Sequence, residues 1–384
     1  MSASAMFLPV LILTAVLGGA TYYFAQRFTQ IIRYFAPRFP LWVCLCLFAL
    51  LMLALVAGFF RSMMQLPDGL RQALKVISAY WMGAFVYLLL FFVLCDAALL
   101  AGGLFKLIPR PFSPLTRCVS AGAAVVLALS TSLYGFVHAA DVRHVSYDVS
   151  LPGQAQGMNI VLISDLHLGA VGSEERLDQI IREINALQPD LICMAGDLFD
   201  NDFGAIRNPD RVREQLLALR SAFGVYACLG NHDAGSSFHQ MTAFLEECGI
   251  RLLNEEAAVI DNRLVLAGRL DRSPIGANGG LQRRQMADIL SGIDETLPVV
   301  VMDHNPARAD AYGSEADLIL CGHTHKGQIF PGSLITSRMY TVDYGHARPD
   351  ENGPQVIVTS GVGTWGPPMR VGTDCEIVTI RLVP

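Results

Sequence analysis

Five short motifs in the second half of the chain are rich in side chains that bind metal ions. In chain order they are Asp165-Leu166-His167, Gly196-Asp197, Gly230-Asn231-His232-Asp233, His304 and Gly322-His323-Thr324-His325. Carboxylate, amide and imidazole ligands together suit borderline divalent metals such as Mn, Fe, Zn or Co. The set is larger than one tetrahedral site needs, but it suits two metal ions that share a bridging carboxylate. These residue types therefore predict a centre with two divalent metal ions.

Each motif stands at or just after the end of an apolar run that reads as a strand. The predicted strands are 158–164, 190–195, 224–229, 263–268, 298–303, 317–321 and 355–359. Helical patterns alternate with them near 174–187, 209–221, 237–248 and 280–291. Nearly continuous apolar runs are typical of strands that are covered on both faces. Because open α/β sheets bind ligands at the carboxyl ends of their strands, we expect the five motifs to serve one site.

The ordered set DxH, GD, GNH[D/E], H and GHxH resembles the signature of the calcineurin-like metallophosphoesterase superfamily. The resemblance covers about residues 155–384. It implies an α/β fold, a four-layer αββα sandwich, and the hydrolysis of a phosphodiester, phosphomonoester or pyrophosphate bond. The expected nucleophile is a water molecule between two metal ions, which would clamp the attacking and leaving oxygens.

The same resemblance implies a role for each matched residue. Three side chains would hold the first metal, namely Asp165, His167 and His325. Asp197 would bridge both ions, and the second would be held by Asn231, His304 and His323. His232 would lie near the leaving-group oxygen without binding a metal, and Asp233 would orient it. Asp200 would either support the site from behind or cap a local turn.

Three further residues are candidates for contacting the substrate. The segments 304–306, 322–329 and 360–370 resemble a membrane-associated or exported bacterial branch of the superfamily, which has glycine where this chain has Lys326. Lys326 would add positive charge beside a phosphate or would face solvent. Arg370 would bind a phosphate and Trp365 an apolar or ring moiety. The alternative for these two residues is a packed loop that closes the sheet.

The first part of the chain has the composition of a membrane region. Residues 1–140 contain nine Lys/Arg and two acids, a net charge of +7, whereas residues 141–384 contain 19 Lys/Arg and 32 acids, a net charge of −13. Four stretches are apolar enough to cross a bilayer, which needs roughly 20 helical residues. They are about 6–24, 41–60, 78–102 and 118–138. We expect a linker at 141–154, followed by the metallophosphoesterase domain.

The distribution of basic residues predicts an orientation in the membrane. The loops near 25–40 and 103–117 carry six Lys/Arg, and the loop between the second and third spans carries three. The positive-inside rule favours the first two loops in the cytoplasm. With four spans, the C-terminal domain would then lie outside the cytoplasm, anchored in a plasma membrane of the bacterial inner-membrane type. Asp96 falls inside the third span, where a carboxylate is either functional or a helix–helix contact.

Several alternatives remain open at the level of the sequence. Four spans exceed what a tether requires, so a lipid-linked phosphate is one expected substrate and a soluble phosphate ester is the other. The domain could instead be a non-catalytic, metal-dependent sensing or binding module. A nucleic-acid substrate is disfavoured by the acidic domain and the membrane anchor. The sequence carries no signal of subunit number.

Overall fold

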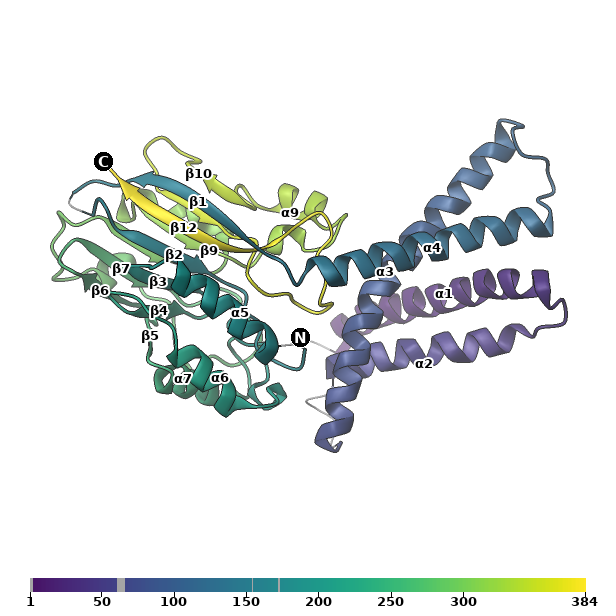
Figure 1. Cartoon of the computed structure of the whole chain (residues 1–384), viewed down its shortest axis with the longest axis horizontal. Coiled ribbons are helices and arrows are strands. Elements are labelled where there is room, and N and C mark those ends of the chain that lie inside the picture. Colours follow the sequence, from purple (N-terminus) through teal and green to yellow (C-terminus); the bar gives the residue numbers. More distant parts are fainter. Residues whose placement is uncertain (1–2, 61–65, 154, 172) are drawn as a thin grey trace. The chain divides into compact units, whose positions relative to one another are not determined.

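The computed structural model describes residues 3–60, 66–153, 155–171 and 173–384. They form two compact units. The first comprises residues 1–135 together with 366–368, and the second comprises residues 136–365 together with 369–384. Figure 1 shows the helices of the first unit and the strands of the second. The two units are described in turn.

Four helices make up the first unit. They are α1 (Ala3–Phe35), α2 (Leu41–Phe60), α3 (Asp68–Leu104) and α4 (Pro114–His138). Among the residues whose side chains are described, three segments are long and apolar enough to cross a membrane, namely Leu41–Phe59, Gly69–Leu104 and Pro114–His138. The remaining predicted span, 6–24, falls within α1, and the side chains of its first residues are not among those described. The protein therefore has the helices of a membrane protein, and the expected count of four spans stays a prediction.

Asp96 of α3 is paired with α1. Its carboxylate accepts hydrogen bonds from the guanidinium of Arg27 and the hydroxyl of Tyr23. An unpaired carboxylate within so apolar a helix would be costly in a bilayer. The hydrogen bonds of Asp96 therefore also restrict how α1 and α3 pack. Next to it, the ring of Phe24 is fully buried and packs edge-on against Phe85.

Two six-stranded sheets form the centre of the second unit. The first has the order β1-β12-β2-β3-β4-β5 and the second β10-β11-β9-β8-β7-β6. In the first sheet the strands are β1 (Val142–Ser150), β12 (Cys375–Val383), β2 (Asn159–Ile163), β3 (Leu191–Ala195), β4 (Val225–Cys228) and β5 (Ile250–Leu252). In the second they are β10 (Gly345–Ala347), β11 (Gln355–Val358), β9 (Leu318–Cys321), β8 (Val299–Met302), β7 (Leu264–Gly268) and β6 (Glu256–Ile260).

Parallel pairing brings the strand ends together. Strands β2, β3, β4 and β5 are parallel to one another, and so are β7, β8, β9 and β11. The metal-binding motifs follow β2, β3, β4, β8 and β9, so within each sheet they lie together at the carboxyl ends of the strands. This is the placement that the sequence predicts.

Helices cover the outer faces of both sheets and complete four layers. On the first sheet lie α5 (Ser173–Ala186), α6 (Pro209–Leu217) and α7 (Phe238–Glu247), which Figure 1 shows together beside β2 to β5. The second sheet is covered by α8 (Met286–Ile289) and the 3-10 segment η3 (Pro306–Glu315). The core between the sheets is apolar and includes Leu162, Leu266 and Met302. The expected αββα sandwich is thus confirmed.

The structure differs from the sequence prediction in its smaller elements. The segment expected as a linker, 141–154, contains β1, which pairs along its whole length with β12. Its alternating polar and apolar residues fit a half-exposed strand at the sheet edge. Strands β5, β6, β10 and β12 also went unpredicted, and the predicted helix 280–291 shrinks to the four residues of α8. The glycines at 279 and 280, both with positive φ, are incompatible with a helix start there.

Candidate metal centre

Asp165, His167 and His325 converge in one buried cluster. Their ligand atoms lie within 4.8 Å of one another. The Nε2 atoms of His167 and His325 are 3.2 Å apart, and Asp165 Oδ1 lies 3.3 Å from the Nε2 of His325. Two imidazole nitrogens and a carboxylate oxygen thus point at a common volume. These are the three side chains expected to hold the first metal.

The second cluster contains Asp197, His304 and His323, whose ligand atoms also lie within 4.8 Å of one another. The amide oxygen of Asn231 is 2.8 Å from the Nδ1 of His323, so the fourth expected ligand is adjacent. Asp197 faces both clusters, because its Oδ2 lies 3.1 Å from His304 Nε2 and 3.8 Å from His167 Nε2. The structure therefore brings together all seven predicted ligands, with Asp197 between the two groups.

The backbone of most of the predicted ligand residues adopts a strained, left-handed conformation. Five of the seven predicted ligands have positive φ, between 47° and 70°, namely Asp165, His167, Asp197, His323 and His325. Non-glycine residues adopt this conformation only when the surrounding structure imposes it, and such residues cluster at functional sites. Close packing contributes here: a Cβ atom at Gly322 would lie 1.8 Å from the hydroxyl of Ser164. The loops are shaped to aim side chains inward.

The hydrogen bonds of the histidine ring nitrogens indicate whether this arrangement suits metal ions. The Nδ1 of His304 is 2.7 Å from the carbonyl of Ala195, to which it can donate, and its Nε2 then presents a lone pair to the cavity. Metal-binding histidines commonly donate their other nitrogen to a backbone carbonyl in this way. Within the described chain, His304 Nε2 is buried and makes no hydrogen bond of regular geometry, although the carboxylate of Asp197 lies 3.1 Å away. A divalent cation would bind both this nitrogen and the carboxylate, so the donor set fits metal ions.

The electrostatics of the centre reflect burial and mutual attraction. Burial raises the pKa of Asp165 to about 6 and lowers the pKa of His167 to about 3. For His304, burial disfavours the charged ring, but the carboxylate of Asp197 outweighs it and raises the pKa well above the usual value. Without metal ions, a proton on His304 thus offsets the charge of Asp197.

His232 lies beside the clusters, as expected, but a different residue orients it. Its ring is 5.1 Å from that of His167, its Nδ1 hydrogen bonds with the side chain of Asn201, and Asp200 Oδ1 lies 3.9 Å away. The carboxylate of Asp233, which was expected to orient the ring, instead accepts hydrogen bonds from the backbone amides of Leu198, Phe199 and Gly230. The predicted role of Asp233 is wrong, because its oxygens are used to fix the two ligand-bearing loops.

Arg370 is also placed differently from the expectation. It is 0% exposed, so it has no access to a substrate. Its guanidinium donates to the carbonyls of His325 (2.9 Å), Ser360 (2.7 Å) and Gly363 (2.7 Å). A buried guanidinium with several carbonyl acceptors fixes the backbone around it. Arg370 therefore supports the loop that carries His325, and the expected phosphate contact is excluded.

The remaining two candidates differ from each other. Trp365 is 40% exposed, and its ring centroid lies 5.8 Å from that of His232. Both its backbone amide and its carbonyl are held by the side-chain amide of Gln328. The ammonium of Lys326 lies 3.8 Å from the ring centroid of Tyr344, which gives it an aromatic partner. Trp365 is thus the better placed of the two for a ligand at His232.

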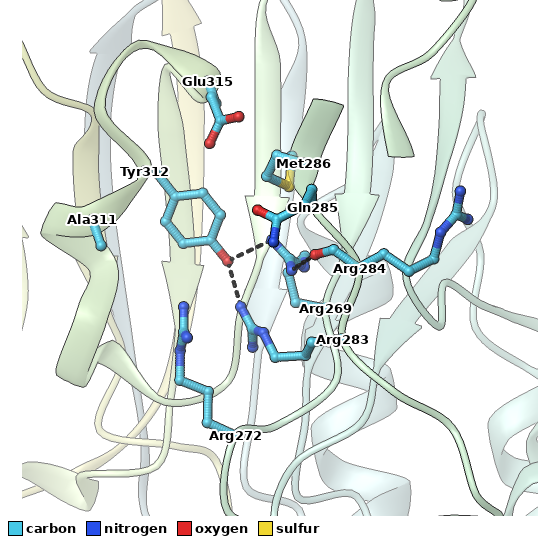
Figure 2. Close-up of a pocket in the computed structure, with 9 residues that line it drawn as sticks. All are labelled: Arg269, Arg272, Arg283, Arg284, Gln285, Met286, Ala311, Tyr312 and Glu315. Atoms are coloured by element: carbon cyan, nitrogen blue, oxygen red, sulfur yellow. Dashed lines mark hydrogen bonds between the residues drawn. The ribbon is translucent and has the colours of Figure 1, made fainter. Parts of the chain in front are cut away.

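Sequence reasoning missed a group of arginines behind His304. Arg269, Arg272, Arg283 and Tyr312 line a cavity of about 220 Å³, in which the guanidinium of Arg283 and the hydroxyl of Tyr312 point toward each other (Figure 2). Arg283 and Tyr312 both donate to the carboxylate of Asp303, the residue before His304. The signal available in the sequence was the density of arginines at 269–284. This network fixes Asp303, the residue between β8 and His304.

Replacement of Arg370 by methionine should loosen the metal-binding loop. The change removes three charge-assisted hydrogen bonds, each worth about 1.5–3 kcal/mol, and takes away the donor to the carbonyl of Ser360. We expect a fall in melting temperature on the order of 10 °C and a lower content of bound metal after dialysis. Arg348→Met, at an exposed arginine, is the matched control. Wild-type metal content and melting temperature in the Arg370 variant would contradict this role.

Comparisons with known proteins agree with the geometry. Residues 158–327 match the family model described as calcineurin-like phosphoesterase. A "Transmembrane protein with metallophosphoesterase domain" from Danio rerio is 30% identical over 359 residues, covering 88% of this chain and 80% of the relative. An "Uncharacterized metallophosphoesterase" from Aquifex aeolicus is 32% identical over 260 residues, covering 66% of this chain and 98% of the relative.

The Danio rerio relative aligns over most of the chain, beyond the limits of the catalytic unit. Because that relative comes from a vertebrate, the likeness to a bacterial branch stays a prediction. The metal clusters, the layered sheets and these relatives lead to one conclusion: the chain belongs to the calcineurin-like phosphoesterase family and is a metal-dependent phosphoester hydrolase.

Proposed function

We propose that the protein hydrolyses a phosphate ester at a membrane surface, using two divalent metal ions held by the seven ligands, of which six are buried and His323 is half-buried. The observation that carries the proposal is the convergence of Asp165, His167 and His325 on one side of Asp197 and of His304 and His323 on the other. Two sets of ligands that share one carboxylate suit a pair of metals that act on one phosphoryl group.

The distances between the side chains support the ligand roles that the sequence predicts. Asp165, His167 and His325 would hold one ion, Asn231, His304 and His323 the other, and Asp197 both. Bound divalent cations would supply a nucleophile from water at neutral pH and offset negative charge on the phosphoryl oxygens. The donor set suits Mn, Fe, Zn or Co.

His232 is the group proposed to donate a proton to the leaving oxygen. Its Nδ1 is engaged by Asn201, with Asp200 close by, so the ring is held and its other nitrogen is available for a substrate. A positioned imidazole of this kind contributes roughly 10²–10⁴-fold to a rate. Trp365, packed beside this ring and part exposed, would contact the group that leaves.

The substrate proposed is a lipid-linked phosphate or pyrophosphate. In the described part of the chain, three segments are long and apolar enough to cross a membrane, which is more than a tether needs. An active site fixed at a bilayer would meet headgroups at high local concentration. Lys326 would add positive charge near the phosphate if it left the ring of Tyr344. We further propose that the catalytic unit lies outside the cytoplasm, as the basic loops predict.

Hydrolysis of bis(p-nitrophenyl) phosphate with added Mn tests the reaction. The wild-type chain should turn over, and Asp197→Ala should lose at least about 100-fold in rate together with bound metal, because one change removes a ligand from both ions. Asp310→Ala, at an exposed acid, serves as the control. Equal rates for Asp197→Ala and the wild type would favour a non-catalytic binding module.

Substitution of His232 by alanine tests its role through the leaving group. An alkyl oxygen must be protonated as it leaves, whereas p-nitrophenolate leaves readily without a proton. We therefore expect the variant to lose about 100-fold or more with an alkyl ester and much less with the aryl ester. Asn201→Ala should show the same pattern more weakly. An equal loss with both esters would argue against proton donation.

Fusion of reporters to the C-terminus tests the orientation. Alkaline phosphatase folds to an active form only outside the cytoplasm, and a conventional fluorescent protein becomes bright inside it. We expect an active phosphatase fusion and a dark fluorescent fusion, since six basic residues lie in the loops assigned to the cytoplasm. The reverse pattern would place the catalytic unit in the cytoplasm.

A further inference from the structure

A short helix near the metal centre presents its apolar side chains to solvent. No residue of α9 (Ser333–Met339) is buried, and Leu334, Ile335 and Met339 are 50%, 60% and 67% exposed. Among the described residues of 142–384, nine large hydrophobic side chains are exposed, and four of them lie between 330 and 339. Scattered exposed apolar residues are ordinary, but a concentrated group marks a surface that contacts another apolar phase.

The charge of α9 fits a lipid surface. The helix contains no acidic residue, although the catalytic unit as a whole carries excess acid. Its one charged side chain, Arg338, is exposed and stays on the helix by donating to the carbonyl of Leu334. Apolar side chains beside an arginine are typical of segments that lie in the interface of a bilayer with anionic lipids.

The position of α9 within the catalytic unit points to the same partner. His138, the last residue of α4, contacts the carboxylate of Asp374 at 2.9 Å. Three residues earlier, the carbonyl of Val371 accepts a hydrogen bond from the amide of Phe330, just before α9. Three residues of chain span at most about 10 Å. Within the second unit, the last residue of α4 therefore lies close to the start of α9, and α4 is long and apolar enough to cross a bilayer.

Hydrogen bonds connect α9 to the ligand His325. The hydroxyl of Thr336 donates to the carboxylate of Asp343 at 3.0 Å, and the hydroxyl of Thr324 donates to the carbonyl of the same residue at 2.6 Å. Gly327 packs so closely on the start of α9 that a Cβ atom there would lie 2.1 Å from the amide of Ser333. A surface that α9 contacts is therefore held near the metal-binding loop.

We propose that α9 inserts Leu334, Ile335 and Met339 into the interfacial layer of the bilayer that α4 enters. The insertion holds the metal centre at the depth of lipid headgroups. The contact itself does not depend on catalysis. Its consequence for substrate choice rests on the proposed function and selects lipid-linked phosphates over soluble ones.

Fluorescence quenching by spin-labelled lipid tests the insertion directly. The full chain, with the exposed Cys46 and half-exposed Cys95 replaced by alanine, would carry an environment-sensitive thiol probe at Ile335→Cys, since the other seven cysteines are buried. It would be reconstituted in vesicles of phosphatidylcholine and phosphatidylglycerol that contain 5-doxyl lipid. The matched control is a probe at Ala243→Cys, an exposed position of α7 on the outer layer of the first sheet.

We expect the doxyl lipid to quench the probe at 335 and to leave the probe at 243 unchanged. Absence of quenching at 335 would overturn the proposal, whether a second copy of the chain, another protein or water covers the helix. The measurement uses no turnover, so a chain that proved inactive would fail the proposed function and leave this result standing.

Rates on two substrates test the consequence. Ile335→Asp should slow hydrolysis of a lipid phosphodiester in the same vesicles by about tenfold, because the inserted apolar side chain is replaced by a charged one that stays in water. Hydrolysis of bis(p-nitrophenyl) phosphate should be unchanged. Ser337→Asp adds the same charge at an exposed polar position of α9 and should have little effect on either rate. Equal slowing of both substrates by Ile335→Asp would contradict the role in presenting lipid.

Discussion

The buried guanidinium of Arg370 is the interaction on which the geometry of the metal centre depends most. Its donors reach the carbonyls of His325, Ser360 and Gly363, and so connect the segment after β9 with the segment after β11. Left-handed backbone at the ligands stores strain, and strain persists only where surrounding bonds impose it. A fixed charge amid carbonyl oxygens is one such constraint. The carboxylate of Asp233, which accepts three backbone amides on the opposite loops, is another.

Arg370 and Asp233 have opposite charges but the same structural role. Each lies within a motif that suggests chemistry, and each is used to bond backbone. The side chains proposed to act on a substrate are fewer: the seven ligands, His232 held by Asn201, and Trp365 held by Gln328. The rigidity of that small set comes from buried polar groups, which are costly to leave unpaired and so specify one arrangement.

The convergence of the predicted ligands could be expected from the sequence because all five motifs follow apolar runs, and the carboxyl ends of parallel strands lie together. The parallel sheets could be predicted for a similar reason, since runs such as 298–303 read as buried on both faces. The direction in which a long side chain points could not be predicted from the sequence. Arg370 points inward because backbone carbonyls distant in sequence surround it, and nothing in the segment 360–370 encodes their positions. Strand β1 was missed because its polar residues face solvent at a sheet edge that only the distant β12 creates.

Polar groups also restrict the arrangement of the helical unit, whose surroundings would be lipid instead of water. Asp96 and Arg27, from α3 and α1, are both unfavourable in hydrocarbon, and their ion pair with the hydroxyl of Tyr23 resolves this. The rings around Phe24 then complete the contact between helices. In a lipid environment, where apolar contacts give little preference among helix arrangements, such a polar pair defines which helices are neighbours.

The pairing of β1 with β12 has a consequence for the order of events during synthesis. β1 follows α4 by three residues, whereas β12 ends at residue 383, yet β12 lies between β1 and β2 in the sheet. Neither β1 nor β2 can acquire that neighbour until nearly the whole sequence has been translated. The helices of the first unit can enter the bilayer as they are made, but the first sheet closes only at the end. During that interval β1 has an unpaired edge, and its charged and polar side chains disfavour pairing with other chains.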